Sequence, residues 1–205
     1  IIFLLIEIAR ARKASSTGWY HVVGRGNNRQ SVFRQDRDFK RFLELLRAYR
    51  ARHPVQISNY CLMSNHVHLL LFSEQRELLS KFLQGVQLSY SWWYRRSYGF
   101  CGHVWQGRFK SFPIEKDSYL LECSRYIERN PINAGMVSDP KDYPWSSYRF
   151  YVENPLDPML TANPGYLSLG TTEGERRHRY QQYVTATRPY ELPDPERLYP
   201  VFQGW

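Results

Sequence analysis

Apolar and polar positions divide the first half of the chain into segments with strand and helix periodicity. Residues 19–23 are aromatic and β-branched and stop at a loop rich in Gly and Asn, which predicts a first strand. Apolar residues at helical spacing over 36–52 predict a helix that a His-Pro pair closes. Apolar runs at 55–63 and 67–72, separated by a polar Ser-Asn pair, are typical of neighbouring antiparallel strands.

The same alternation of strands and helices continues toward residue 133. Residues 78–98 have a helical pattern that stops at a glycine, and 104–114 predict a strand with a glycine inside and a proline near its end. A third helix is capped at residue 117 or 118 and ends or kinks near Pro131, because the residue before a proline is pushed out of helical geometry. The resulting βαββαβα order is that of a ferredoxin-like α+β sandwich, with helices on one face of an antiparallel sheet.

The composition changes at both ends of this core. We expect a core domain over 17–152, an irregular Pro-rich C-terminal appendage over 153–205, and an N-terminal extension over 1–16 that lies outside the core. The apolar run 1–9 is too short to span a bilayer, and its positive charges follow it, whereas those of a signal peptide come first. We interpret the first residues as a fragment or a mis-set start, and expect no membrane association.

The chain carries a surplus of positive charge, with 28 Lys and Arg against 19 Asp and Glu and a formal net charge of +9. Such a surplus favours a polyanionic partner such as nucleic acid, although it also serves solubility. Two tryptophans stand beside Arg95 and Arg96 in segment 91–96. This mixture suits stacked bases beside phosphates, or the buried stripe of an amphipathic helix. The 3 cysteines lack CxxC spacing and favour a reducing compartment.

Two pairs of residues indicate phosphodiester chemistry. His66 and His68 are separated by one residue on a predicted strand, so both project from the same face and form half of a metal site. A His-x-His pair is also ordinary on the wet side of a sheet. Tyr126 and Asn130 lie one helical turn apart. A tyrosine oxygen that attacks a phosphodiester leaves a covalent protein–DNA link, and its phenol needs activation by a metal, a base or a cation because its ordinary pKa is ~10.

Further polar and basic residues are candidates for phosphate contacts. The loop after the first strand and the strand before the third helix supply them: Arg25, Asn27, Asn28, Arg29, Arg108 and Lys110. A tight hairpin turn explains the loop as well, and ordinary solvated charges explain the two cations of the strand. His21, His53 and His103 are isolated in the sequence, and we assign no chemistry to them.

Several separated segments, in order, resemble the motifs of one family. They are YHVVGRGNNR (20–29), YCLMSNHVHLL (60–70), VWQGRFKS (104–111), YIERNPINAGMV (126–137) and YPWSSY (143–148). The chain resembles the REP-associated tyrosine transposases, which are single-Tyr members of the HUH superfamily related to insertion-sequence transposases. The resemblance covers residues 17–150, and a joint match in order is far more specific than any single spacing.

The resemblance implies a catalytic domain that cleaves single-stranded DNA beside hairpin (REP- or BIME-like) elements, as an endonuclease and strand transferase with a 5′-phosphotyrosine intermediate. It also implies Mg²⁺ or Mn²⁺, and a place in the bacterial cytoplasm with the nucleoid. By position, His66 and His68 match the HUH pair, Tyr126 matches the nucleophile, and Asn130 stands where a polar third ligand, in some relatives Gln, is expected. On ligand softness alone the set also suits Zn²⁺ or Ni²⁺.

Other functions remain open at this point. A ferredoxin-like sheet with exposed aromatic residues is also typical of non-catalytic nucleic-acid-binding modules. A structural zinc site would use Cys61, Cys101, His103 and the His pair, but the sequence lacks a paired-cysteine knuckle. The protein is a monomer or a homodimer, and the short Asn-Pro break after the third helix favours Tyr126 acting in cis.

Overall fold

The computed structural model describes residues 14–153 and 156–187, so the predictions for 1–13 and 188–205 lie outside the described residues. The strands are β1 (Trp19–Arg25), β2 (Gln56–Met63), β3 (His66–Phe72) and β4 (Lys110–Ile114). The helices are α1 (Asp36–Arg50), α2 (Arg76–Tyr98), α3 (Leu120–Asn133), α4 (Tyr148–Glu153), α5 (Pro164–Leu167) and α6 (Glu173–Thr185). Short 3-10 turns cover Asn27–Arg29, Asp117–Tyr119 and Pro140–Asp142.

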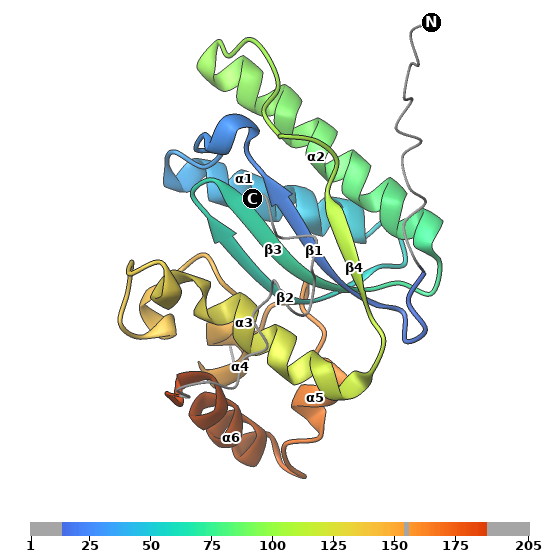
Figure 1. The fold of residues 1–205 in the computed structure, drawn as a ribbon, viewed down its shortest axis with the longest axis vertical. Coiled ribbons are helices and arrows are strands. Elements are labelled where there is room, and N and C mark those ends of the chain that lie inside the picture. Colours follow the sequence, from blue (N-terminus) through green and yellow to red (C-terminus); the bar gives the residue numbers. More distant parts are fainter. Residues whose placement is uncertain (1–13, 154–155, 188–205) are drawn as a thin grey trace, which may run out of the picture.

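The strands form one antiparallel sheet in the order β2-β3-β1-β4 (Figure 1). Together with α1, α2 and α3 they give the predicted βαββαβα order of a ferredoxin-like sandwich. The last strand is shorter than the predicted 104–114, since β4 begins only at Lys110. Residues before it form a loop that is joined to the end of β1 by a bridge between Trp105 and Gly26.

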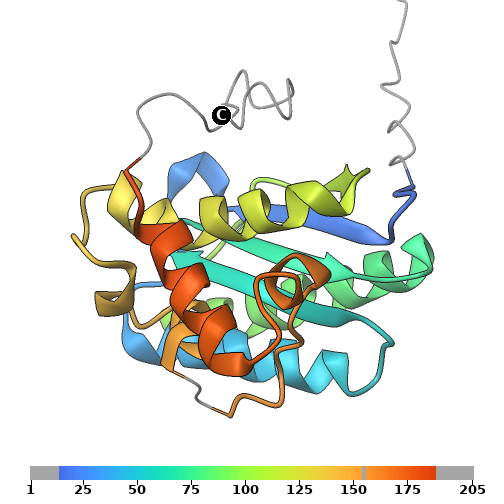
Figure 2. The ribbon, with the colours of Figure 1, turned by 90° about the horizontal axis from the view of Figure 1, so that it is seen from below.

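The prediction that all helices cover one face is wrong, because α3 packs on the opposite face from α1 and α2 (Figures 1 and 2). The strands are apolar on both sides: Val22 and Leu69 face α1 and α2, while Leu70 faces α3. A sheet that is buried on both faces shows nearly continuous apolar runs, so the sequence pattern alone does not reveal the second layer.

Helix α3 continues to Asn133 with Pro131 inside it, past the predicted break. A proline in a helix leaves the carbonyl four residues earlier without its N–H partner. Here that carbonyl belongs to Ile127, and the Asn130 side-chain amide donates to it over 3.4 Å and to the Tyr126 carbonyl over 2.8 Å. A side chain of the helix thus donates to the carbonyl that Pro131 leaves without its backbone partner.

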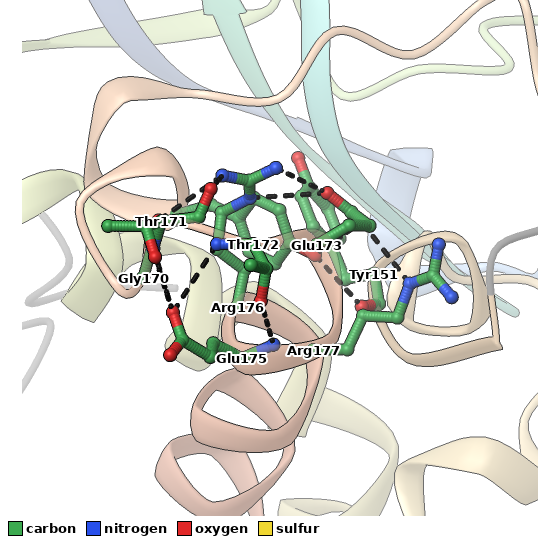
Figure 3. A network of polar contacts seen from close by, with 9 residues as sticks. Tyr151, Gly170, Thr171, Thr172, Glu173, Glu175, Arg176 and Arg177 are labelled. Atoms are coloured by element: carbon green, nitrogen blue, oxygen red, sulfur yellow. Dashed lines mark hydrogen bonds and ion pairs between the residues drawn. The ribbon is translucent and has the colours of Figure 1, made fainter.

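The described part of the predicted irregular appendage contains the helices α5 and α6, joined by loops. Helix α6 begins with a capping box between Thr172 and Glu175, and Glu173 pairs with Arg176 and Arg177 (Figure 3). Its buried residues are only Tyr180 and Val184, so its apolar stripe is too narrow to stand out among the charged residues. These two residues pack with tyrosines of α4 and α5 in a small separate core. Within the described residues no helix is long and apolar enough to cross a membrane.

Candidate active site

Strand alternation brings three histidines to the face of the sheet that α3 covers. His66 and His68 of β3 share this face, as predicted. In the antiparallel register His66 pairs with Arg25, and Val23 pairs with both His68 and Lys110. Arg25 of β1 and Lys110 of β4 therefore lie on the same face of the sheet as the two histidines.

His68 is held by a third histidine that the sequence did not single out. Its Nδ1 lies 3.0 Å from Nε2 of His21, and the two rings stack at 22° with centroids 5.2 Å apart. His21 is fully buried, and burial lowers its pKa to about 3. The pKa of His68 is also lowered, first by burial and then by the neighbouring imidazoles. His21, which looks isolated in the sequence, thus contacts a predicted metal ligand; strand alternation in β1 was the available signal.

His66 lies at the edge of this group, next to loop residues and the end of α3. Its Nδ1 is 2.6 Å from the Asn65 side-chain oxygen. Burial and the charge of Arg25 lower its pKa to about 4, while a hydrogen bond with Asn130 acts in the opposite direction. The Asn130 side-chain amide nitrogen donates to the Tyr126 carbonyl at 2.8 Å.

Tyr126 projects from α3 toward His68 and His21. Its ring is perpendicular to that of His68 at 5.5 Å between centroids, and edge-on to His21 at 5.7 Å. The spacing of Tyr126 and Asn130 on one helical face, predicted from the sequence, thus places both over β3. Tyr126 is half-buried, so one side of the ring packs on the core and the other is reachable from solvent.

The side chains present fit a divalent metal ion in chemistry. His66 and His68 are held in the neutral form that ligation requires, and Asn130 offers an amide oxygen beside them. Among the described residues there is no cluster of three or more His, Cys, Asp or Glu suited to a metal. The structural zinc interpretation therefore gains no support, and burial raises the pKa of the Cys61 thiol, which disfavours the thiolate that zinc binds.

The predicted phosphate-binding residues separate into two groups. Arg25 and Lys110 lie on the histidine side of the sheet, where burial lowers the pKa of Lys110. The loop residues Asn27, Asn28 and Arg29 follow Arg25 in an exposed 3-10 turn. This loop is not a hairpin turn, because β1 pairs with β3 and β4 and leads into α1. Its backbone is instead tied to the β2–β3 turn and to the loop before β4.

The second group lies away from the histidines, at the end of α2. Arg95 and Arg96 are exposed there, and Arg108 is exposed in the loop before β4, outside the strand in which it was predicted. Arg95 and Arg108 line a groove of about 350 Å³ between α2 and the loop before β4. Trp92 is 64% exposed, and the Arg96 guanidinium lies 5.6 Å from the centre of its ring. Its neighbour Trp93 packs against the core, so Trp93 belongs to the buried stripe of the helix and Trp92 does not.

A buried polar network fixes α3, and with it the tyrosine, to the rest of the molecule. Glu128 accepts hydrogen bonds from Asn59 of β2 at 2.8 Å, Ser147 at 2.7 Å and Tyr180 of α6 at 2.7 Å. Burial raises the pKa of this carboxyl to about 7, against the effect of the three donors. No local sequence pattern indicates this network, because its members are separated by up to 121 residues.

Two arginines of α3 add a second connection to α6. Arg125, which is 1% exposed, donates to the carbonyls of Tyr183 and Ala186, and Arg129 donates to that of Val184. These carbonyls lie at the C-terminal end of α6, where cations satisfy groups that have no helical partner. Helix α3 is thus fixed between the sheet and α6.

Two histidines on one strand of an antiparallel sheet thus face a tyrosine on a helix, which is the arrangement that the motif resemblance implies. The chain belongs to the family of IS200-like transposases, whose family model matches residues 14–130. The resemblance drawn from the motifs is thus confirmed.

The fold is similar to that of a REP-associated tyrosine transposase bound to a REP hairpin, with a TM-score of 0.59 and 19% identity over 77% of this chain and 93% of that chain. A transposase candidate from Deinococcus radiodurans R1 matches less closely, with a TM-score of 0.41 and 16% identity over 58% of this chain and 95% of that chain. Among curated proteins, none matches significantly.

Proposed function

We propose that the protein cleaves and rejoins single-stranded DNA beside hairpin elements, with Tyr126 as the nucleophile. The observation that carries this proposal is the placement of the Tyr126 ring at 5.5 Å from that of His68, on the face that also presents His66 and Asn130. The similarity of fold to a transposase bound to a REP hairpin supports the choice of DNA substrate.

His66, His68 and Asn130 would hold Mg²⁺ or Mn²⁺, with the amide as the least conventional ligand of the three. When bound, the cation would supply positive charge for the phosphate and for the developing phenolate. The chain itself orients the parts: β3 fixes the imidazoles, and α3 brings Tyr126 and Asn130 over them together. Such positioning contributes to the rate because it removes the entropy of bringing the reactants together.

In the proposed reaction the Tyr126 phenol loses its proton to solvent and its oxygen bonds to phosphorus. The bond from phosphorus to the 3′ oxygen breaks, and that oxygen takes up a proton. The DNA 5′ end is then held as a phosphotyrosine, which conserves the ester bond for rejoining by attack of a 3′ hydroxyl. Arg25 and Lys110, on the same face, provide positive charge for the strand that carries the scissile phosphate.

The exposed cations at the end of α2 extend this basic surface. Arg95, Arg96 and Arg108 would contact phosphates of the hairpin or its flanks, and Trp92 would offer a ring for stacking. The loop before β4 connects this group to the histidine side, since its Gln106 N–H donates to the Arg25 carbonyl at 2.9 Å. One strand could thus follow the loop from the groove to the histidines.

The tyrosine would act on DNA bound by its own chain. Support comes from the contacts of Tyr126 with His21 and His68 of the same chain, and from the attachment of α3 through Glu128. Mixing His66→Ala and Tyr126→Phe chains tests this, because exchange of the tyrosine helix between chains would restore cleavage. No restoration is expected, for a monomer or for a dimer.

The test of the function is a denaturing gel of the protein with labelled hairpin-containing single-stranded DNA and Mn²⁺ or Mg²⁺. A covalent adduct is expected that requires the metal and disappears in Tyr126→Phe. Tyr119→Phe is the matched control, since Tyr119 is 43% exposed, directly before α3, and should leave the adduct unchanged. Tight binding without adduct under any metal would overturn the nuclease proposal and favour the non-catalytic nucleic-acid-binding module.

A further inference from the structure

His21 is a buried polar residue in the middle of the site that the proposed reaction does not use. It lies on β1 between Leu70 and Phe112 in the sheet register and has an exposed fraction of 0%. Its Nε2 is 3.0 Å from Nδ1 of His68, and the two rings are stacked. A buried imidazole in this position needs a reason, because an apolar residue would fill the space with no polar atoms to satisfy.

The hydrogen bond restricts how His68 can act. Two neutral imidazoles form such a bond only when one nitrogen carries the proton and the other offers its lone pair. With Nδ1 of His68 engaged by His21, Nε2 is the nitrogen that remains for a metal ion. A ligand through Nε2 must carry its proton on Nδ1, so His68 donates and His21 accepts.

We propose that His21 is a positioning residue for His68: by accepting the Nδ1 proton it holds His68 in the tautomer and orientation that present Nε2 to a divalent cation. This inference rests on the proposed function, in which His68 is a ligand. Histidine ligands elsewhere have their second nitrogen bonded to a carboxylate, a carbonyl or water, which fixes the ring and increases its basicity. Here an imidazole would take that place.

The geometry also connects His21 to the nucleophile. The Tyr126 ring meets His21 edge-on at 5.7 Å and His68 at 5.5 Å, so removing the side chain would open space beside the tyrosine. The test must therefore distinguish loss of the hydrogen-bond acceptor for His68 from loss of the space that the His21 side chain fills. His21→Phe keeps a planar ring without an acceptor, while His21→Gln keeps an oxygen that can accept from His68.

The experiment measures Mn²⁺ affinity of the full chain by calorimetry, without DNA, and confirms folding of each variant by its melting temperature. His21→Phe is expected to weaken Mn²⁺ binding by about 10- to 100-fold, the usual effect of losing such a partner, and His21→Gln is expected to recover most of the affinity. His53→Gln is the matched control, because His53 contacts Tyr49 at the end of α1, and should bind like the wild type.

The tautomer gives a second measurement that needs no metal. Long-range ¹H–¹⁵N correlations of the metal-free protein are expected to show the His68 proton on Nδ1, and on Nε2 in a fraction of His21→Phe molecules. Equal Mn²⁺ affinity of wild type and His21→Phe would overturn the inference and leave the proposed function intact, as would equal losses in the Phe and Gln variants. A wild type that binds no Mn²⁺ would instead refute the metal site, and a proton on Nε2 of wild-type His68 would refute the role of His21.

Discussion

The buried carboxyl of Glu128 should make the stability of this protein depend on pH in a defined window. Burial raises its pKa from an ordinary value of 4.5 to about 7, so the folded state holds the proton more tightly than the unfolded state. The contribution to stability is fully present below 4.5 and is lost as the pH rises through 7. At about 1.4 kcal/mol per pKa unit, the loss is about 3 kcal/mol.

Glu128→Gln removes this titration and keeps an oxygen for Asn59 and Ser147, which both donate to Oε1. The amide NH2 group would stand at the Oε2 position and can donate to the Tyr180 hydroxyl. We expect the stability of the variant relative to wild type to increase by about 3 kcal/mol between pH 4.5 and 8. Urea unfolding at closely spaced pH values measures it through the shift in midpoint at constant slope. Glu44→Gln is the control, since Glu44 is exposed on α1 and forms an ion pair with Arg41, and its curve should run parallel to that of wild type.

A difference between Glu128→Gln and wild type that stays constant across this range would refute the reasoning. A variant that becomes relatively less stable at high pH would show that the three donors outweigh burial and that the carboxylate is ionised in the fold. In that second case the attachment of α3 would also be stronger, because a charged Glu128 is bound far more strongly by its donors.

Four further substitutions test the polar network, the proposed metal and DNA contacts, and the packing of β1. Tyr180→Phe, which removes a 2.7 Å donor to Glu128, should lower stability by about 2 kcal/mol at pH 8 and by less at pH 5 in urea unfolding; equal losses would contradict it. Asn130→Ala should weaken Mn²⁺ binding by calorimetry, and an unchanged affinity would remove Asn130 from the ligands. Lys110→Ala should reduce the salt slope of single-stranded DNA binding by about 0.7, and an unchanged slope would exclude a phosphate contact. Gly24→Ala should cost about 1–3 kcal/mol in thermal unfolding, because a Cβ would lie 2.2 Å from the buried Phe109 ring; wild-type stability would contradict this.

Much of the sheet and of the site was predictable because both depend on short-range patterns. The pair His66 and His68 needs only the two-residue period of a strand, and Tyr126 with Asn130 needs only the turn of a helix. The family motifs then related the histidine pair to the pair on the helix, and in the structure Tyr126 lies against His68. The end of the third helix was less predictable, since the helix continues past Pro131, where the Asn130 side chain donates to the carbonyl that the proline leaves without its backbone partner.

The features that could not be predicted depend on contacts between residues that are distant in the sequence. His21 looked isolated, because its partner is 47 residues away and becomes visible only once β1 and β3 are paired. Helix α6 was missed because its buried face consists of Tyr180 and Val184 alone. Arg95 and Arg96 appeared beside aromatic residues as predicted, but no local pattern indicates that α2 lies on the other side of the sheet from the tyrosine.

The connection between α3 and α6 has a consequence for any attempt to isolate a minimal catalytic fragment. The family match ends at residue 130, inside α3, yet Tyr180 and the carbonyls bound by Arg125 come from 173–186. A chain cut at residue 153 would keep each residue proposed for catalysis, but would leave Arg125 and Glu128 without these partners. Protease cleavage between α4 and α6 should therefore loosen the tyrosine helix before it affects the sheet.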